Sequence, residues 1–518
     1  MGMTSDLYGI RGGRAIVGAF FALLCLALVP IILIDPDSSI ALVLAMVVAF
    51  FIVKRPVVGI LLVIVTTSTI ISPSVLPVIR IFGADVEFTE ILIILLTIVT
   101  FLMVGFAKAL KTIFSSPVTI PLLLFLALAV ASIFYSFSIY RNLEATEILA
   151  RSRSLFYYLL FFPAVLAMGN EKDLRFLVKG LLVIAALVSL YFIYTAVFGI
   201  TYLHVLFQTG VMPGAGITSV DTGSLSNRML FNARISGIPG TSLVVTMFFV
   251  VVTLFIYHYS TGGAIWFGLL SALFAIPILL TFTRTTWATT LFIFPVLWLL
   301  IRKRRIRLTK LAFIMGGGFL AVFLAFALHP KYSEIIGFTV DRFRSFFEEN
   351  VETPTAVMRI VEMKAAMEEI EKNPMMGIGV AGMITDKTIK YHGREFVLMD
   401  SSSHNAFVAL ALKMGIPAVV IFLAVYLFSL HGAGRVFRRS PEPYIKALSL
   451  GLFLGLLRSF LNAFSQPYFI EIHMIPCLAI SFAIVEVLRQ RSRREFERKA
   501  VAPGRELALS TKSYPMPF

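Results

Sequence analysis

Residues 401–422 read SSSHNAFVALALKMGIPAVVIF and pass without interruption from polar side chains into an apolar run. Their polar part closes a segment from about Pro330 to Ser403, the largest water-compatible stretch of the chain. Most of the remainder is apolar, because 58% of the 518 residues are hydrophobic and 14% are charged. This composition excludes a soluble globule and indicates a polytopic membrane protein.

Apolar runs that can cross the bilayer recur from Ala15 to Val487. A span needs roughly 20 apolar residues, and on that measure the sequence predicts about 12–14 transmembrane helices and an all-α fold. The first run, Ala15 to Ile34, is too long for a signal-peptide core, and Asp35-Pro36-Asp37 follows it in place of a cleavage site. We therefore expect a retained helix.

The net charge of +16 comes largely from short basic clusters beside apolar runs. Such clusters mark cytoplasmic loops, and they do not form the basic surface of a nucleic-acid-binding domain. With these clusters in the cytoplasm, both termini are cytoplasmic and the long polar segment lies outside, which in a bacterium is the periplasm. The clusters are Lys54-Arg55, Arg302–Arg305, Arg435–Arg439 and Arg489–Lys499.

Four regions follow from this topology. Residues 1–329 are expected to form transmembrane helices with short loops, and residues 330–404 a periplasmic helical cap. Residues 405–488 form the C-terminal transmembrane helices, and residues 489–518 a basic cytoplasmic tail that we expect to be disordered. The cysteines, Cys25 and Cys477, both lie in apolar runs and predict neither a metal pair nor a disulfide framework.

The cap segment has two predicted helices. Residues 332–347 mix apolar and charged side chains, as in a helix that lies on a membrane or protein surface. Thr353 as N-cap and Pro354 at the first helical position begin a second helix, which Asn373-Pro374 ends. Its wet face is expected to hold Arg359, Glu362, Lys364, Glu368, Glu369 and Glu371.

Gly377–Gly382 fits the pattern G-x-G-x-x-G. A dinucleotide site needs that loop between a buried strand and a helix, whereas here it follows a helix in an outer loop. We interpret the glycines as positions where the backbone packs closely as the cap re-enters the membrane domain.

Three polar residues at span ends are candidates for function. Arg234 precedes a span, Arg284 lies at a hairpin between spans, and His404 begins another. Charges near hydrocarbon usually face a cavity, a partner or a substrate, although arginines also snorkel to the interface and His404 could satisfy backbone groups at a helix start. Arg458 lies inside the apolar run Ala447–Phe464, where a structural contact and a substrate role are both open.

Two arginines and a histidine on the outer face suit one chemistry. Guanidinium forks match phosphate oxygens and can stabilise a lipid-linked diphosphate as a leaving group. Histidine can take a proton from an attacking hydroxyl. Because no aspartate-rich cluster accompanies them, we expect neither a metal ion nor a cofactor.

At these positions the chain resembles the O-antigen ligase and polymerase superfamily. Arg234-Ile235-Ser236-Gly237 resembles an Arg-x-x-Gly block, and Thr283–Ala288 a Ser-Arg-Gly-x-Trp block. The helix from Arg359 to Asn373-Pro374 and its glycines resembles a third block, and His404-Asn405 followed by Gly415 a fourth. Two departures concern packing more than charge: Ala418 and Thr285 stand where glycine is common.

The resemblance implies a GT-C-like membrane fold and metal-independent, inverting glycosyl transfer. His404 would be the base, and Arg234 and Arg284 would bind the diphosphate of an undecaprenyl-type donor. Arg359, Asn405 and Arg458 are further candidates, and for Arg359 substrate binding and anchoring of the cap are both open.

The resemblance also implies the acceptor and the place of action. The acceptor would be lipid A core or a growing glycan at the bacterial inner membrane, with no nucleic-acid partner. Ligase, polymerase and protein transferase activities are not separated by sequence. A lipid-linked glycan flippase is the alternative from another class, and it predicts charges at mid-bilayer depth and an internal repeat.

Overall fold

A computed structural model describes most of the chain. The described residues are 47–68, 70–71, 78–81, 84–198, 240–257, 263–281, 283–301, 309, 312, 316, 317, 354–384, 387–391, 394–398 and 403–510. The predictions that lie outside them include the first span at 15–34, the cluster Arg302–Arg305, the cap helix at 332–347, the N-cap Thr353 and the position of Arg234.

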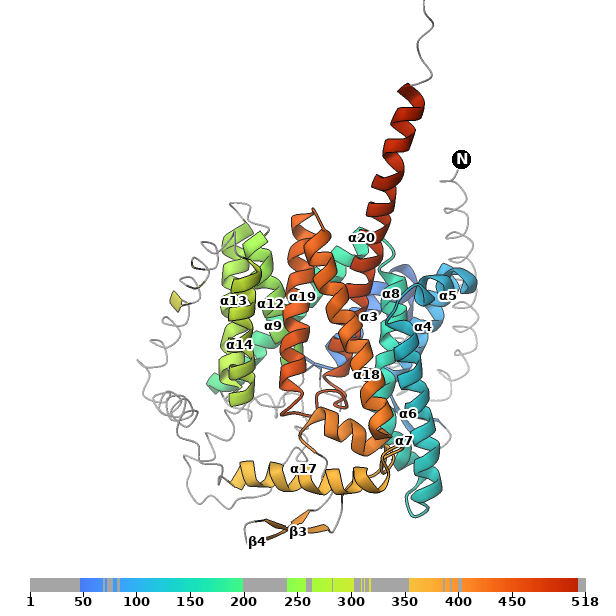
Figure 1. Cartoon of the computed structure of the whole chain (residues 1–518), viewed down its shortest axis with the longest axis vertical. Coiled ribbons are helices and arrows are strands. Elements are labelled where there is room, and N and C mark those ends of the chain that lie inside the picture. The colour runs from blue at the N-terminus through green and yellow to red at the C-terminus, as the bar shows by residue number, and fades with distance from the viewer. Residues whose placement is uncertain are drawn as a thin grey trace, which may run out of the picture.

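Helices dominate the described residues (Figure 1). The elements before the long gap are α3 Pro56–Thr66, β1 Val78–Ile81, β2 Ala84–Glu87, α4 Phe88–Val104, α5 Phe106–Phe114, α6 Thr119–Ile139, α7 Ala145–Phe156, η2 Tyr157–Leu160, α8 Phe161–Ala167 and α9 Glu171–Phe198. Those after it are α12 Thr241–Tyr257, α13 Gly263–Leu280, α14 Arg284–Leu300, α17 Pro354–Lys372, β3 Lys387–Tyr391, β4 Arg394–Leu398, α18 Ala406–Arg439, α19 Pro443–Asn462 and α20 Ile475–Ser510.

This is an all-α polytopic membrane protein. Within the described residues, four helices are long and apolar enough to cross a bilayer: α6, residues 171–194 of α9, α18 and α19. Helices α4 and α5 form a fifth candidate that is bent by 105° at Gly105. Shorter apolar helices, among them α12 and α14, add to the bundle. The count of about 12–14 spans stays a prediction.

Two short antiparallel hairpins depart from the all-helical expectation. Strand β1 pairs with β2, from Val78 opposite Glu87 to Ile81 opposite Ala84. Strand β3 pairs with β4 from Lys387 opposite Leu398. The second hairpin lies within the segment predicted as a helical cap, so the cap contains both helix and sheet.

Helix α12 packs against α19, α13 and α9. Its side chains are mostly apolar and almost all buried, as expected of a helix enclosed by other helices. Two glycines of α19 allow it to lie close to α12. A Cβ at Gly451 would lie 2.5 Å from Cα of Val250, and one at Gly455 would lie 3.0 Å from the Thr246 side chain. Small residues let membrane helices pack closely in this way.

Three ion pairs lie at the end of the bundle where α9 and α19 begin. Arg175 of α9 pairs with Glu442, just before α19, at 2.8 Å. Arg55 pairs with Asp173 at 3.1 Å, and Arg489 of α20 with Glu486 at 2.7 Å. Helix α20 projects from this end (Figure 1). It continues to Ser510, so the prediction of disorder from residue 489 is wrong for residues 489–510.

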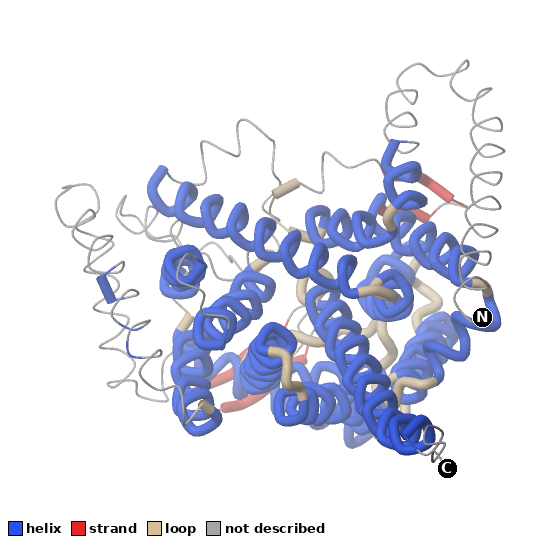
Figure 2. Tube along the Cα trace, turned by 90° about the horizontal axis from the view of Figure 1, so that it is seen from above, coloured by secondary structure: helices blue, strands red, loops and turns tan. Residues whose placement is uncertain are grey.

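The opposite end carries the cap. Helix α17 lies across it, and the β3–β4 hairpin lies beyond α17 (Figure 1). Helix α17 begins at Pro354 and ends at Lys372, before Asn373-Pro374, as the sequence predicted. The start of α18 is joined to the end of α19 there, because the Ala406 N–H donates to the Ala463 carbonyl at 2.8 Å. Seen from above, the helices of the bundle are packed around one another (Figure 2).

Candidate functional site

His404 lies two residues before the start of α18, at the cap end of the bundle. Its side chain is 49% exposed. The next residue, Asn405, is the N-cap of α18: its Oδ1 accepts hydrogen bonds from the N–H groups of Phe407 at 2.9 Å and Val408 at 3.2 Å. Asn405 therefore fixes where the helix begins, and His404 precedes this N-cap residue with an accessible ring.

Glu362 of α17 contacts the His404 ring. The Glu362 Oε2 lies 2.5 Å from Nδ1 of His404, and the glutamate side chain is only 8% exposed. The prediction that Glu362 lies on the wet face of α17 is wrong. The helical phase could have revealed this, because Glu362 falls on the side that Val361, Ala365 and Ala366 bury.

Arg359 stands one turn before Glu362 on α17. Its Nε is buried and has no hydrogen-bond partner. Residues three apart on a helix are neighbours on its surface. The structure thus brings Arg359, Glu362 and His404 into one region of the cap.

Arg284 is the first residue of α14. Helix α12 starts at the cap end, since Thr246, near that start, packs against Gly455 near the end of α19. Helix α13 returns along α12, and α14 starts beside its end; Phe294 of α14 packs against Phe248 and Phe249 of α12. Arg284 therefore lies at the same end of the bundle as His404.

Trp287 fixes the turn before Arg284. Its indole N–H donates to the carbonyls of Ile278 at 3.0 Å and Leu279 at 3.2 Å. Tryptophan in this block therefore joins the end of α13 to the start of α14.

Arg458 is in the interior of the bundle. Its exposed fraction is 1%. One guanidinium nitrogen donates to the Tyr468 hydroxyl at 3.3 Å, while its Nε has no hydrogen-bond partner. This contact ties α19 to the connection that leads into α20, which agrees with the structural alternative considered for Arg458.

The glycine motif packs closely, as predicted. Gly377 and Gly379 have φ of +63° and +87°, and a Cβ on Gly377 would lie 2.1 Å from the Leu412 carbonyl oxygen. The Ile378 N–H donates to that carbonyl at 2.7 Å. Helix α18 is interrupted at this contact, where Gly415 has φ of +80°. The glycines therefore seat the end of α17 in a break of α18.

Polar side chains from α18, from α7 and from the residue after α6 hold the same loop. Buried Lys413 of α18 donates to the Val380 carbonyl at 2.8 Å, and Arg151 of α7 to the Ala381 carbonyl at 2.9 Å. Tyr140, after α6, donates to the Ile378 carbonyl at 2.8 Å. Sequence reasoning missed Lys413 and Arg151, because the carbonyls that they bind belong to a distant segment.

Residues 269–423 match the family model described as O-antigen ligase. The chain carries an O-antigen ligase domain. No curated protein matches the chain. The domain match supports the O-antigen ligase/polymerase family, and with it a membrane glycosyltransferase-like protein that acts on lipid-linked glycans and glycan acceptors in general.

The O-antigen ligase domain runs from within α13 to within α18. It includes Arg284, Arg359, His404 and Asn405, whereas Arg458 lies outside it. Among the residues that the structure describes, no three His, Cys, Asp or Glu side chains gather closely enough to hold a metal ion.

The β3–β4 hairpin of this domain is anchored to α17 by charge. Lys387 pairs with Glu369 at 2.8 Å and with Glu368 at 3.0 Å. Partial burial acts to raise the pKa of the Glu369 carboxyl. The hydrogen bonds from Lys372 and Lys387 outweigh burial and hold this pKa below its ordinary value. Partial burial acts to lower the pKa of Lys387, and the hydrogen bonds to Glu369 and Glu368 outweigh it and raise this pKa above its ordinary value.

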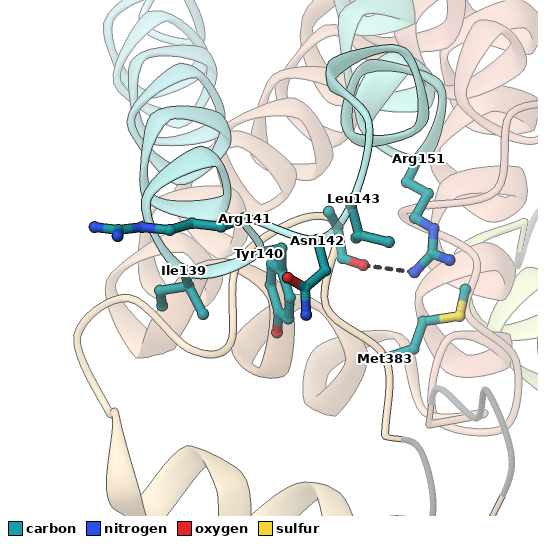
Figure 3. Close-up of a pocket in the computed structure, with 8 residues that line it drawn as sticks. Ile139, Tyr140, Arg141, Asn142, Leu143, Arg151 and Met383 are labelled. Carbon is teal, nitrogen blue, oxygen red and sulfur yellow. Dashed lines mark hydrogen bonds between the residues drawn. The ribbon is translucent and has the colours of Figure 1, made fainter.

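A cavity of about 330 Å³ lies beside the glycine loop (Figure 3). The residues after α6 form one wall, and Ala381 and Met383 form another. The Arg151 guanidinium reaches the Ala381 carbonyl, whereas the Arg141 side chain points away (Figure 3). The cavity adjoins the loop that follows α17, whereas His404 contacts Glu362 in the middle of that helix.

Proposed function

We propose that this protein transfers a glycan from a polyprenyl diphosphate of the undecaprenyl type to an acceptor hydroxyl at the outer face of a bacterial inner membrane. The observation that carries the proposal is the half-exposed His404 imidazole, which lies where the cap meets α18 inside the O-antigen ligase domain. The acceptor would be lipid A core or a growing surface polysaccharide.

In the proposed step, a ring nitrogen of His404 takes the proton of the acceptor hydroxyl. The acceptor oxygen forms a bond to the anomeric carbon while the bond from that carbon to the diphosphate oxygen breaks. The electron pair leaves with the polyprenyl diphosphate, and attack from the opposite face inverts the configuration.

Arg234 and Arg284 are proposed to bind the diphosphate. Arg284 supports this at the start of α14, where helix N–H groups and the helix dipole also favour an anion. Thr283, the N-cap residue, donates its hydroxyl to the Thr281 carbonyl and makes no side-chain cap. Arginine charge would thereby stabilise the leaving group without a metal ion.

The three further candidates divide by their surroundings. We assign Asn405 to capping of α18 and Arg458 to a structural contact with Tyr468. We assign Arg359 to substrate binding, because its buried Nε lacks a partner close to His404 and could serve a phosphate or sugar oxygen.

The test is a transfer assay with purified protein. A polyprenyl-diphosphate glycan is supplied with a chelator, and either lipid A core or further donor is offered as the acceptor. The variant His404→Ala is compared with His431→Ala, a matched control because His431 is exposed on the same helix. We expect transfer by the wild type and H431A, and a loss of at least 100-fold in H404A.

Each outcome decides a different part of the proposal. The product distinguishes a ligase from a polymerase, and activity in chelator supports a metal-independent reaction. Full activity of H404A would reject the base. No product from the wild type with either acceptor would reject transfer and favour lipid-linked glycan transport.

A further inference from the structure

The pair formed by Glu362 and His404 crosses two parts of the protein. Glu362 belongs to the cap helix α17 and His404 to the entry of α18, and they are separated by 42 positions in the chain. The Glu362 Oε2 and the His404 Nδ1 lie within hydrogen-bond distance of each other, and a hydrogen bond to an ionised carboxylate is stronger than one between neutral groups. A buried carboxylate in such contact usually has a definite partner.

The contact occupies one ring nitrogen and leaves the other accessible. An ionised carboxylate accepts hydrogen bonds and cannot donate them, so the Nδ1 of a neutral His404 must carry the hydrogen. The lone pair then resides on Nε2. Because the ring is half exposed, Nε2 is available to an acceptor hydroxyl.

We propose that Glu362 is a positioning residue that holds His404 in the tautomer and orientation of a general base, so that the base is complete only while α17 is seated on α18. This inference rests on the proposed glycosyl transfer. Glu362 also stabilises the imidazolium that forms as the acceptor loses its proton. Carboxylate partners orient histidines in this manner at other sites.

The way in which α17 is seated supports this dependence. The loop after α17 donates from Ile378 to the Leu412 carbonyl at 2.7 Å, and Ile416 donates to the Pro374 carbonyl at 2.8 Å. These bonds bridge the break of α18 at Gly415, and they fix the C-terminal end of the helix that carries Glu362. Movement of α17 away from α18 would remove the carboxylate from His404 and disable the base.

The test compares Glu362→Gln with Glu371→Gln, a matched control because Glu371 is exposed on the same helix. For both variants, kcat and KM of transfer are measured from pH 5 to pH 9, and donor affinity is measured by calorimetry. Among the described residues, Glu362 is the ionisable group in contact with the His404 ring, and Arg359 is the nearest charge before it on α17.

For E362Q we expect kcat to fall by about 10- to 100-fold with donor affinity unchanged. The acidic limb of kcat/KM should move to lower pH, because a neutral amide no longer stabilises the protonated ring. E371Q should match the wild type, and Glu362→Asp, which keeps the charge, should recover part of the activity lost in E362Q.

Two results would overturn the inference. If E362Q keeps the kcat and pH profile of E371Q, Glu362 does not act through His404. If E362Q loses donor affinity and its α17 becomes sensitive to protease, Glu362 has only a structural role. Failure of the underlying transfer proposal is distinguishable, because it appears as no product from the wild type with either acceptor, and failure of the base assignment appears as full activity of H404A.

Discussion

Arg284 and Arg458 have opposite surroundings although both begin as isolated arginines near apolar runs. Arg284 starts a helix at the cap end and is partly exposed, whereas Arg458 is buried against Tyr468. A cationic fork at a helix start can meet an incoming phosphate. A buried guanidinium that bonds a tyrosine hydroxyl is already committed to the packing of the bundle.

Replacement of Arg284 by lysine tests the proposed diphosphate contact at the residue scale. Lysine keeps the positive charge and loses the planar fork, so we expect KM for the donor to rise by about tenfold with little change in thermal stability. Arg141→Lys is the control, since Arg141 is exposed after α6. Donor binding by R284K equal to that of R141K would argue against a bidentate contact.

At the scale of elements, the break in α18 is the joint between the cap and the membrane domain. Gly415 has a positive φ, and a Cβ there would lie 2.1 Å from the Met375 carbonyl oxygen. Backbone cannot move aside as a flexible side chain can. The end of α17 is therefore held where an ordinary residue would not fit.

Gly415→Ala should displace the loop after α17 from α18. We expect the free energy of unfolding to fall by about 1–3 kcal/mol because of backbone strain. Transfer activity should also fall, because α17 carries Glu362. Thermal unfolding and the transfer assay measure the two effects. Gly434→Ala on the same helix is the control, since a Cβ there meets only Phe453 ring atoms at 3.8 Å; equal stability of the two variants would contradict the role of the joint.

Attachment of the β3–β4 hairpin to α17 should depend on pH. Lys372 and Lys387 lower the pKa of Glu369 in the folded protein. Ionised Glu369 therefore stabilises the folded cap fully above pH 4.5, its ordinary pKa, and this stabilisation is lost as the pH falls through the lower pKa of the folded state. Glu369 and Glu368 raise the pKa of Lys387 in the folded protein. The stabilisation by charged Lys387 is therefore complete below pH 10.5, its ordinary pKa, and is lost as the pH rises through the higher pKa of the folded state.

We therefore expect a fluorophore on β4 to report an attached hairpin from about pH 4.5 to about pH 10.5, and a freer one only where the pH falls through the lowered pKa of Glu369 or rises through the raised pKa of Lys387. Lys387→Met should weaken attachment across the whole window. Lys364→Met, an exposed change on α17, should leave the profile as it is. A profile of K387M that matches the wild type would exclude the ion pair as the anchor.

At the scale of the whole molecule, the two ends of the bundle differ in chemistry. One end carries the pairs Arg175–Glu442 and Arg489–Glu486 together with helix α20, which projects from it (Figure 1). The other end carries the cap, with His404 and Arg284. The positive-inside rule predicts that the first end is cytoplasmic. This arrangement would place transfer on the opposite side of the membrane.

Cysteine labelling tests that orientation. Glu371→Cys lies on the cap and Arg494→Cys on α20, and both positions are exposed. In spheroplasts, a membrane-impermeant maleimide should label E371C at once and R494C only after lysis. Both variants are made with Cys25→Ser, and the remaining native Cys477 is buried, which limits background labelling. The reverse labelling pattern would invert the proposed topology.

Sequence reasoning predicted α17 well and its contacts poorly. Pro354 at the start and Asn373-Pro374 at the end restrict the backbone locally, and the helix has those bounds. The predicted side of α17 for Glu362 was wrong, because a charged residue was assumed to face water. Only the packing of α17 shows that this carboxylate has His404 as a partner.

The sequence by itself determined the membrane class, the ends of α17 and the close packing of the glycine loop. Apolar span length, proline and glycine act through hydration and local backbone geometry, so their effects can be predicted without knowledge of the tertiary contacts. Tertiary structure alone decided that Glu362 meets His404, that Arg458 bonds Tyr468 and that β3–β4 attaches to α17. Each of these contacts joins different elements, and its energy exists only after those elements pack together.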